Sequence, residues 1–313
     1  SVFGYGLFVV LAHGMLSVYW PALHSWLGGV PDLAQRKRYM AGFNVAWTLG
    51  ILAGPAIAGQ LYAYGYRWPF LGILMGGFVA GAFVARLPEE ERADAREGDP
   101  SPFPQEPLHI TETMVYPVWI ANAFSGALIG ACIAVFSKRI NELVKAGDLV
   151  LAGWGVSALE GLDAPRLFAY LVSLMALSRT AVFFLFGSTH RWHGRMSYFV
   201  VLQAMCGGAF WVLGTTRNYL PMIGCFVLLG ALGGSSYFSS QYYSTANYLR
   251  KHHRAAIHEG TVALGHAFGA LSYGLLAEAF GTTWPFRYTP IAAACGIGLE
   301  MIVFARRRAR VNH

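Results

Sequence analysis

Hydrophobic and polar positions alternate along this chain on the scale of whole helices rather than of single residues. Long apolar runs with almost no formal charge are separated by short polar segments. Because a helix needs about 20 mainly apolar residues to cross a bilayer, we predict nine transmembrane helices. The nine runs are Val2–Leu27, Phe43–Tyr64, Phe70–Val84, Val115–Phe136, Leu167–Phe186, Phe199–Leu213, Met222–Phe238, Thr261–Phe280 and Ile291–Ala305.

The composition indicates that lipid is the main solvent. Of the 313 residues, 55% are hydrophobic and 12% are charged, whereas an ordinary soluble domain has about 25% charged residues. We therefore predict an all-α integral membrane protein. The four cysteines stand singly inside predicted helices, without the spacing of a disulfide framework or a metal site, and the sequence has no catalytic motif. We expect no metal, no cofactor and no enzymatic activity.

An internal repeat relates two distant parts of the chain. Residues 49–70 read LGILAGPAIAGQLYAYGYRWPF and residues 264–286 read LGHAFGALSYGLLAEAFGTTWPF. Three glycines recur with a shift of 215, and Trp-Pro-Phe recurs with a shift of 216. The glycines are Gly50, Gly54 and Gly59 in the first copy, and Gly265, Gly269 and Gly274 in the second. Agreement at this many positions indicates a duplicated unit.

The repeat predicts the domain organisation. The second half opens near Thr111, so the equivalent start of the first half falls roughly 100 residues, or three helices, before Ser1. We expect a partial N-terminal bundle over residues 1–86, a cytoplasmic linker over residues 87–110 and a six-helix bundle over residues 111–313. The linker is acidic and contains several prolines, which is typical of a solvated tether or of a docking segment.

Positive charge is unevenly divided between the two sides of the predicted helices. With nine spans, 15 of the 23 Lys and Arg residues fall on the side of the linker and the C-terminus, and seven fall on the other side. An excess of Lys and Arg marks the cytoplasmic face. We therefore expect a protein of the plasma (inner) membrane with Ser1 outside and His313 in the cytoplasm. The net charge of +7 then reflects membrane orientation rather than nucleic-acid binding.

The first copy of the repeat contains the motif Gly50-x3-Gly54-Pro55-x2-Ala58-Gly59. It is similar to the fifth-helix motif of antiporter-type members of the major facilitator superfamily. The resemblance covers the whole chain, read as helices four to twelve with the first three absent, and implies two helical bundles of which the first is incomplete. Glycines at this spacing let another helix approach closely, and Pro55 permits a bend. The motif and its second copy are expected to pack helices, with or without acting as a hinge.

The chain departs from that family in two places. Residues 187–195 read GSTHRWHGR; the glycines and the final arginine match the family's loop signature, whereas Arg191 and Trp192 stand where its acidic residue and arginine would be. Val10 stands where the family's fourth-helix arginine would be. The resemblance therefore implies neither the acidic latch of that loop in this half nor proton coupling through that arginine.

Two features are candidates for substrate binding. Arg179 lies about two-thirds along its predicted helix, and an ionisable residue at membrane depth is costly and usually functional. It either faces an aqueous cavity, where it binds an anionic group or an acid, or reaches the headgroups. Polar residues of the tenth family helix form two adjoining stripes that should face inward, towards substrate or towards other helices. The stripes are Ser236, Ser240, Tyr243 and Asn247, and Tyr237, Gln241 and Ser244.

The family resemblance adds further candidates, since helices four, five, seven, eight, ten and eleven line the central cavity of that family. The candidates on these helices are His13, Tyr19, Asn44, Trp47, Asn122, Ser125, His266, Ser272 and Tyr273. Other ionisable residues have structural interpretations. Glu259 is expected to cap its helix or to pair with Arg254, Glu300 to find a structural partner or reach the headgroups, and His190 and His193 to lie on the surface of a loop.

Two functions remain open. The first is a secondary transporter that moves a small solute by rocking two halves around a midplane site. The second is a structural or assembly subunit of a larger membrane complex that keeps the fold without transporting. The expected partners are the lipid bilayer, a small-molecule substrate for a transporter and other membrane subunits for a structural protein, with no nucleic acid. The identity of the substrate cannot be read from the sequence.

Overall fold

This computed structural model describes residues 19–20, 22–24, 26–28, 30, 32–62, 64–65, 67–86, 107–151, 163–246 and 251–311. These residues are almost entirely helical and contain no β-strand. Residues 19–20, 22–24 and 26–28 are helical. The remaining helices are α2 (Leu33–Tyr62), α3 (Trp68–Ala85), α4 (Leu108–Ala131), α5 (Ser137–Lys145), α6 (Ala164–Ser188), α7 (Ser197–Thr215), α8 (Tyr219–Ala246), α9 (Lys251–Phe280) and α10 (Trp284–Val311).

Six helical segments in the described part of the chain are long and apolar enough to cross a membrane. They correspond to the last six of the nine predicted spans. Of the first three, the span Val2–Leu27 lies largely outside the described residues. Helix α2 contains the basic residues 36–38 near its start, and α3 has a shorter apolar stretch, Phe70–Ala82. The all-α membrane class is confirmed, and the number nine stays a prediction.

One helix is much longer than its predicted span. A π-helical turn, Cys132–Phe136, joins α4 to α5, so that Leu108–Lys145 is continuous over 38 residues. At 1.5 Å per residue it is about 57 Å long, which exceeds the hydrocarbon core of a bilayer. Arg139 lies in this extension, where its guanidinium donates hydrogen bonds to the carbonyls of Leu213 at 2.8 Å and Thr216 at 3.3 Å.

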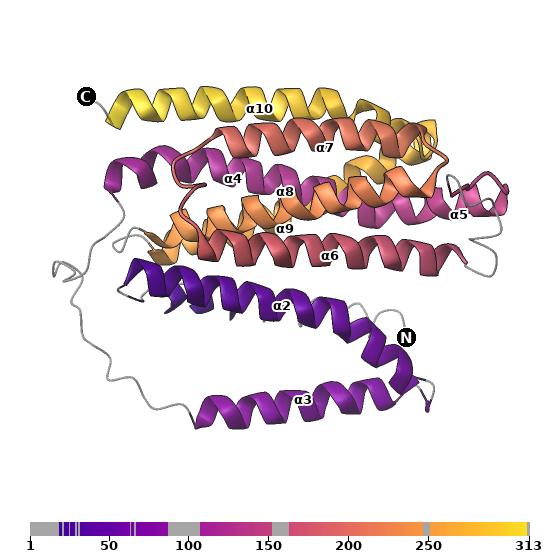
Figure 1. Cartoon of the computed structure of the whole chain (residues 1–313), viewed down its shortest axis with the longest axis horizontal. Coiled ribbons are helices and arrows are strands. Elements are labelled where there is room, and N and C mark those ends of the chain that lie inside the picture. The colour runs from indigo at the N-terminus through magenta and orange to yellow at the C-terminus, as the bar shows by residue number, and fades with distance from the viewer. Residues whose placement is uncertain are drawn as a thin grey trace.

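The helices run along the long axis of the molecule (Figure 1). The α2–α3 and α9–α10 turns lie at one end, whereas the end of α3, the start of α4, the α6–α7 turn and the C-terminal end of α10 lie at the other. Both turns at the first end contain a glycine with positive φ, Gly65 at 131° and Gly281 at 90°. Their separation of 216 equals that of the two Trp-Pro-Phe triplets. The repeat is therefore also present in the backbone conformation.

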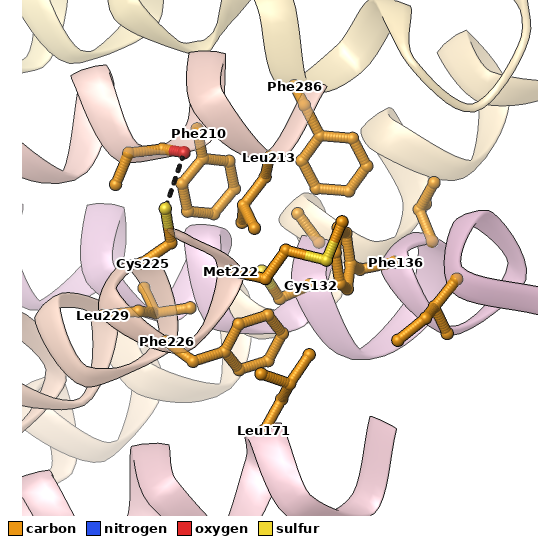
Figure 2. Packing of buried hydrophobic residues seen from close by; sticks show 14 of the residues in the cluster. Cys132, Phe136, Leu171, Phe210, Leu213, Met222, Cys225, Phe226, Leu229 and Phe286 are labelled. Atoms are coloured by element: carbon orange, nitrogen blue, oxygen red, sulfur yellow. Dashed lines mark hydrogen bonds between the residues drawn. The ribbon is translucent and has the colours of Figure 1, made fainter. Parts of the chain in front are cut away.

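An apolar core fills the half of the C-terminal bundle nearest those turns. Figure 2 shows Phe136, Phe210, Phe226 and Phe286 from four different helices packed around Met222. Cys132, Cys206 and Cys225 are free and buried in the same cluster, and the Cys225 thiol donates to the carbonyl of Ala209 at 3.3 Å. These three cysteines act as small packing residues. The polar residues discussed below therefore gather in the other half of the bundle.

The second copy of the glycine motif packs α9 against α4. A Cβ placed on Gly265 would overlap the carbonyl of Ala123, and one placed on Gly269 would overlap that of Ala127. The absence of side chains at these positions lets the two backbones approach closely. At Gly50, Gly54 and Gly274, no described atom lies within 4 Å of such a Cβ.

Candidate functional site

Arg179 of α6 lies among aromatic rings contributed by three helices. Its guanidinium carbon is 4.9 Å from the ring centroid of Trp47 in α2, 5.0 Å from that of Tyr237 in α8 and 5.5 Å from that of Phe183 in α6. The faces of such rings attract a cation within about 6 Å. Arg179 is nine residues from Ser188, the last residue of α6, and therefore lies about 14 Å inside that end of the helix. Its depth is close to the middle of a bilayer core.

Small residues bring these three helices together. A Cβ placed on Gly230 of α8 would overlap the carbonyl of Met175 in α6, and one on Gly234 would lie 3.1 Å from the carbonyl of Arg179, so glycines let α8 approach α6 closely here. At the next contact, a Cβ on Gly187 would overlap the methyl group of Ala41 in α2. The approach of α2 and α8 to α6 carries Trp47 and Tyr237 to the guanidinium.

The Arg179 guanidinium has no anionic partner among the described residues. No carboxylate in the described part of the chain is ion-paired with it, and its buried Nε has no hydrogen-bond acceptor. Ring faces offset only part of the cost of a buried cation, and an unsatisfied donor adds to that cost. The guanidinium is therefore available to an anionic group.

An acid and two histidines lie on the far side of Tyr237. The Tyr237 hydroxyl donates to Glu259 Oε1 at 3.3 Å. The same oxygen is 3.0 Å from His24 Nδ1 and 3.4 Å from His258 Nε2. Both histidine side chains are fully buried, and that of Glu259 is 19% exposed. This cluster of His24, His258 and Glu259 joins the N-terminal part of the chain to α9.

The predicted pairing of Glu259 with Arg254 is wrong. Arg254 donates to Glu112 Oε1 of α4 at 2.6 Å instead. Residues five positions apart on an α-helix are separated by about 140° around its axis, so their side chains point to different faces. Glu259 consequently points to the helix interface that holds His24 and His258.

The polar half of α8 is buried on every side, from Leu232 to Ala246. Ser236 Oγ lies 2.7 Å from Ser125 Oγ of α4, and Gln241 Oε1 accepts from Asn44 Nδ2 of α2 at 2.7 Å. The sequence left open whether these stripes face substrate or other helices. In this structure most of their hydroxyl and amide groups make hydrogen bonds to other helices. Tyr237 is the member of the stripes that contacts Arg179.

Two further candidates, Ser240 and Asn122, contact His258 of α9. Ser240 Oγ lies 2.7 Å from His258 Nδ1, and Asn122 Nδ2 of α4 lies 3.4 Å from the same atom. Asn122 also donates to Thr261 Oγ1 at 3.4 Å. Ser240 and Asn122 thus belong to the surroundings of the histidine–glutamate cluster.

The other predicted site residues make no cation–π contact or hydrogen bond with Arg179, or they lie outside the described residues. His13 and Asn247 are outside the described residues. His266 packs against glycines of α4 with its Nδ1 2.9 Å from the carbonyl of Val262. Of the rest, Tyr19 is exposed, Ser272 donates to the backbone of its own helix, and Tyr273 bonds Thr289 beside the apolar core.

The loop between α6 and α7 is held by an aromatic side chain where the family has an acidic latch. Trp192 is buried, stacks on Phe186 at 5.0 Å and donates through Nε1 to the Phe186 carbonyl at 3.0 Å. The backbone N–H of Gly194 donates to the Tyr243 hydroxyl at 2.9 Å. Tyr243, predicted to bind substrate, therefore anchors this loop.

His193 is not the surface histidine that was expected. It is half-buried, with its ring centroid 4.0 Å from that of Trp192 and 4.8 Å from that of Tyr242. Burial, reinforced by electrostatic interaction with nearby His190 and Lys37, lowers the pKa of His193 from 6.5 to about 4. His193 is consequently neutral at physiological pH.

Glu300 was expected either to have a structural partner or to reach the headgroups, and the structure shows a structural partner. Its carboxylate is fully buried and accepts from Gln203 Nε2 of α7 at 2.8 Å at both oxygens. The pair joins α10 to α7, away from Arg179.

A cavity of about 500 Å³ lies between α2 and α6 and is lined in part by Lys37, Arg38, Phe184 and His190. Arg38, Phe184 and His190 are exposed, so this cavity is a groove at the surface. Arg179 is not among the residues that line it.

The described residues thus form an all-α multi-pass membrane protein with a polar, charged interior in one half of its bundle. A comparison with protein families matches the Major Facilitator Superfamily over residues 1–258. Because the match covers most of the chain, this protein belongs to that superfamily. Membership indicates a membrane transporter of the secondary type. Comparison with curated proteins finds no match.

Sequence reasoning named Arg179 and Trp47 as candidates but did not predict the cluster of His24, His258 and Glu259. A signal for it was present, since His24 interrupts an apolar run and His258 precedes an acid near the start of another. The rule that ionisable residues in membrane helices are functional candidates applies to both. The sequence does not show that these two segments, more than 230 residues apart, lie next to each other in the fold.

Proposed function

We propose that this protein is a secondary transporter that moves a small solute by alternating access, with an anionic group of the solute bound at Arg179. The observation that carries the proposal is a half-buried arginine whose Nε is buried and whose guanidinium has aromatic neighbours but no ion-paired carboxylate among the described residues. An anion at this position would supply the missing charge and accept the unsatisfied Nε–H.

The location of Arg179 fits alternating access. Its contacts join α2, from the N-terminal part of the chain, to α6 and α8 of the C-terminal bundle. Transporters of this kind bind substrate near the midplane between two repeats and rock the repeats around it. A solute held between Trp47, Tyr237 and Arg179 would therefore contact both moving parts.

The proposal includes the domain division and the membrane orientation given by the sequence. Residues 1–86 and 111–313 form the two bundles, equivalent to helices four to twelve of the family, and the C-terminus is cytoplasmic in the inner membrane. Arg195→Cys, placed in the exposed α6–α7 loop with Cys295 replaced by serine, tests the orientation. An impermeant thiol reagent should label it only after the membrane is opened, and labelling of intact cells would contradict this orientation.

Substitution of Arg179 tests the function. The protein is reconstituted in liposomes and the uptake of small carboxylates, phosphates and sulfonates is measured at equal protein amounts. Arg179→Ala should reduce uptake of the accepted anion at least tenfold, and Arg179→Lys should retain part of it because the charge remains. Arg307→Ala is the matched control, since Arg307 lies 3.6 Å over the ring of Tyr116 on another part of the molecule.

Equal uptake by Arg179→Ala and wild type would contradict the proposal. Uptake of neutral solutes alone would contradict the anionic substrate class. If no solute is transported and Arg179→Ala instead lowers the yield or detaches a co-purifying membrane protein, the structural-subunit alternative replaces the transporter.

A further inference from the structure

We propose that His24, His258 and Glu259 form a binding site for a divalent transition metal ion of the zinc type. The inference goes beyond the proposed transport of an anion and does not depend on it. Two imidazole nitrogens and one carboxylate oxygen are a ligand set that suits zinc and its first-row neighbours. Three protein ligands leave a fourth position for water or another group.

The spacing of the three ligand atoms fits one ion. One nitrogen of each histidine and a carboxylate oxygen lie within 4.8 Å of one another. Glu259 Oε1 is 3.0 Å from His24 Nδ1 and 3.4 Å from His258 Nε2. In a tetrahedral site with bonds of about 2.1 Å, neighbouring ligand atoms are about 3.4 Å apart. These two separations therefore need little adjustment to hold a metal.

Buried nitrogens that have no polar contact other than Glu259 provide a second observation. His24 and His258 are both fully buried. Three ring nitrogens have no hydrogen-bond partner among the described residues beyond the contacts to Glu259. They are the two nitrogens of His24 and Nε2 of His258. A buried polar atom that is left unpaired is costly. A metal ion at this point would satisfy His258 Nε2 and His24 Nδ1 at once.

The surroundings of His258 already orient it as a metal ligand. Ser240 Oγ is 2.7 Å from its Nδ1, on the side of the ring opposite Nε2. Ligating histidines almost always donate their second ring N–H to an oxygen, which fixes the tautomer. In the tautomer that carries the proton on Nδ1, this hydrogen goes to Ser240 and the lone pair of Nε2 faces Glu259. The Tyr237 hydroxyl, 3.3 Å from Glu259 Oε1, similarly holds the carboxylate.

The charges around the cluster determine which kind of fourth ligand the metal ion would prefer. Among the described residues, Glu259 is the one acid that contacts the two histidines, and Arg179 lies over the ring of Tyr237, whose hydroxyl donates to Glu259. A divalent ion held by one carboxylate keeps a net positive charge, and Arg179 adds another. The fourth ligand is therefore expected to be an anion or a water molecule that has lost a proton.

Cobalt binding tests the site, because Co²⁺ replaces Zn²⁺ and its tetrahedral complexes absorb visible light. The full chain, purified in detergent without chelator, is titrated with Co²⁺, and Zn²⁺ is then used to displace it. We expect one Co²⁺ per chain with a tetrahedral spectrum. His24→Gln, His258→Gln and Glu259→Gln should each weaken binding at least tenfold, whereas His253→Gln, an exposed histidine of the same helix, should leave it unchanged.

Ser240→Ala keeps all three ligands and separates an ordered site from an effect on folding. It should weaken Co²⁺ binding about tenfold to a hundredfold, as other partners of ligating histidines do. Arg179→Ala should bind Co²⁺ at least as tightly as wild type, since it removes a neighbouring positive charge, even though it is expected to lose transport. Failure of wild type to bind Co²⁺ or Zn²⁺, or equal binding when all three ligands are replaced in a folded chain, would overturn the proposal.

Discussion

Arg179 of α6 holds its guanidinium 4.9 Å from the ring centroid of Trp47 in α2. The contact joins the N-terminal part of the chain to the C-terminal bundle at the depth of the polar interior. The Trp47 ring also stacks on Tyr237 at 5.6 Å. One tryptophan thus orders both the arginine and the tyrosine that separates it from Glu259.

Trp47→Ala should destabilise the protein by about 2 to 4 kcal/mol, because it removes a cation–π contact and the packing of a large ring. Trp47→Phe keeps a ring face and should lose less than half as much. Thermal unfolding in detergent measures both, with Trp26→Ala as an exposed control. Equal losses for the alanine and phenylalanine variants would show that the ring face does not contribute.

Gly269→Ala should destabilise the contact between α4 and α9. The new methyl group would overlap the carbonyl of Ala127, and overpacking of this kind costs about 1 to 3 kcal/mol. Gly274→Ala lies on the same helix, where no described atom is within 4 Å, and should leave stability unchanged or slightly raise it. A comparison of the two unfolding midpoints measures the difference. Similar midpoints would contradict the close approach of these helices.

Gln203→Leu should destabilise the protein by about 1 to 3 kcal/mol or more, because it leaves the buried Glu300 carboxyl group without its donor. Replacement of both residues by leucine should recover much of the loss, since no polar group is then left unpaired. Denaturant unfolding of the two single variants and the double variant gives the coupling. Additive losses would mean that the two side chains do not interact.

His193 should make stability fall with acidification between pH 6.5 and about 4. Its pKa is lower in the folded protein than in the unfolded chain, so the unfolded chain binds the proton first as the pH falls. The stabilisation is complete above pH 6.5 and is lost as the pH approaches about 4. Unfolding temperatures measured across this range should depend less on pH in His193→Gln than in wild type. His253→Gln, an exposed histidine of α9, should keep the wild-type dependence. Identical profiles for His193→Gln and wild type would contradict the buried environment of His193.

The membrane class and most of the helices could be predicted because they depend on local properties. A long run of apolar residues indicates a membrane-spanning helix whatever the rest of the chain contains. The last six predicted spans all correspond to helices in the structure. The length of α4 with α5 was underestimated, since the polar residues 137–145 continue a helix beyond its apolar part. A polar segment does not reveal whether its helix stops at the membrane surface.

The sequence also singled out Arg179, because the cost of a charge in an apolar run is a local property as well. It determined the repeat, including two turns whose glycines, Gly65 and Gly281, have positive φ.

Only the tertiary structure decided which residues meet. His24 and Glu259 are 235 positions apart, and Glu259 turned away from the nearby Arg254 because side chains five residues apart lie on different helix faces. In the same way, Trp192 holds the α6–α7 loop through rings supplied by α6 and α8. The sequence by itself determined the helices and the cost of their buried charges. The partners of those charges depend on which helices pack together, and close contacts at glycines such as Gly234 determine this packing. The periodicity of side chains within one helix does not show which other helices it will contact.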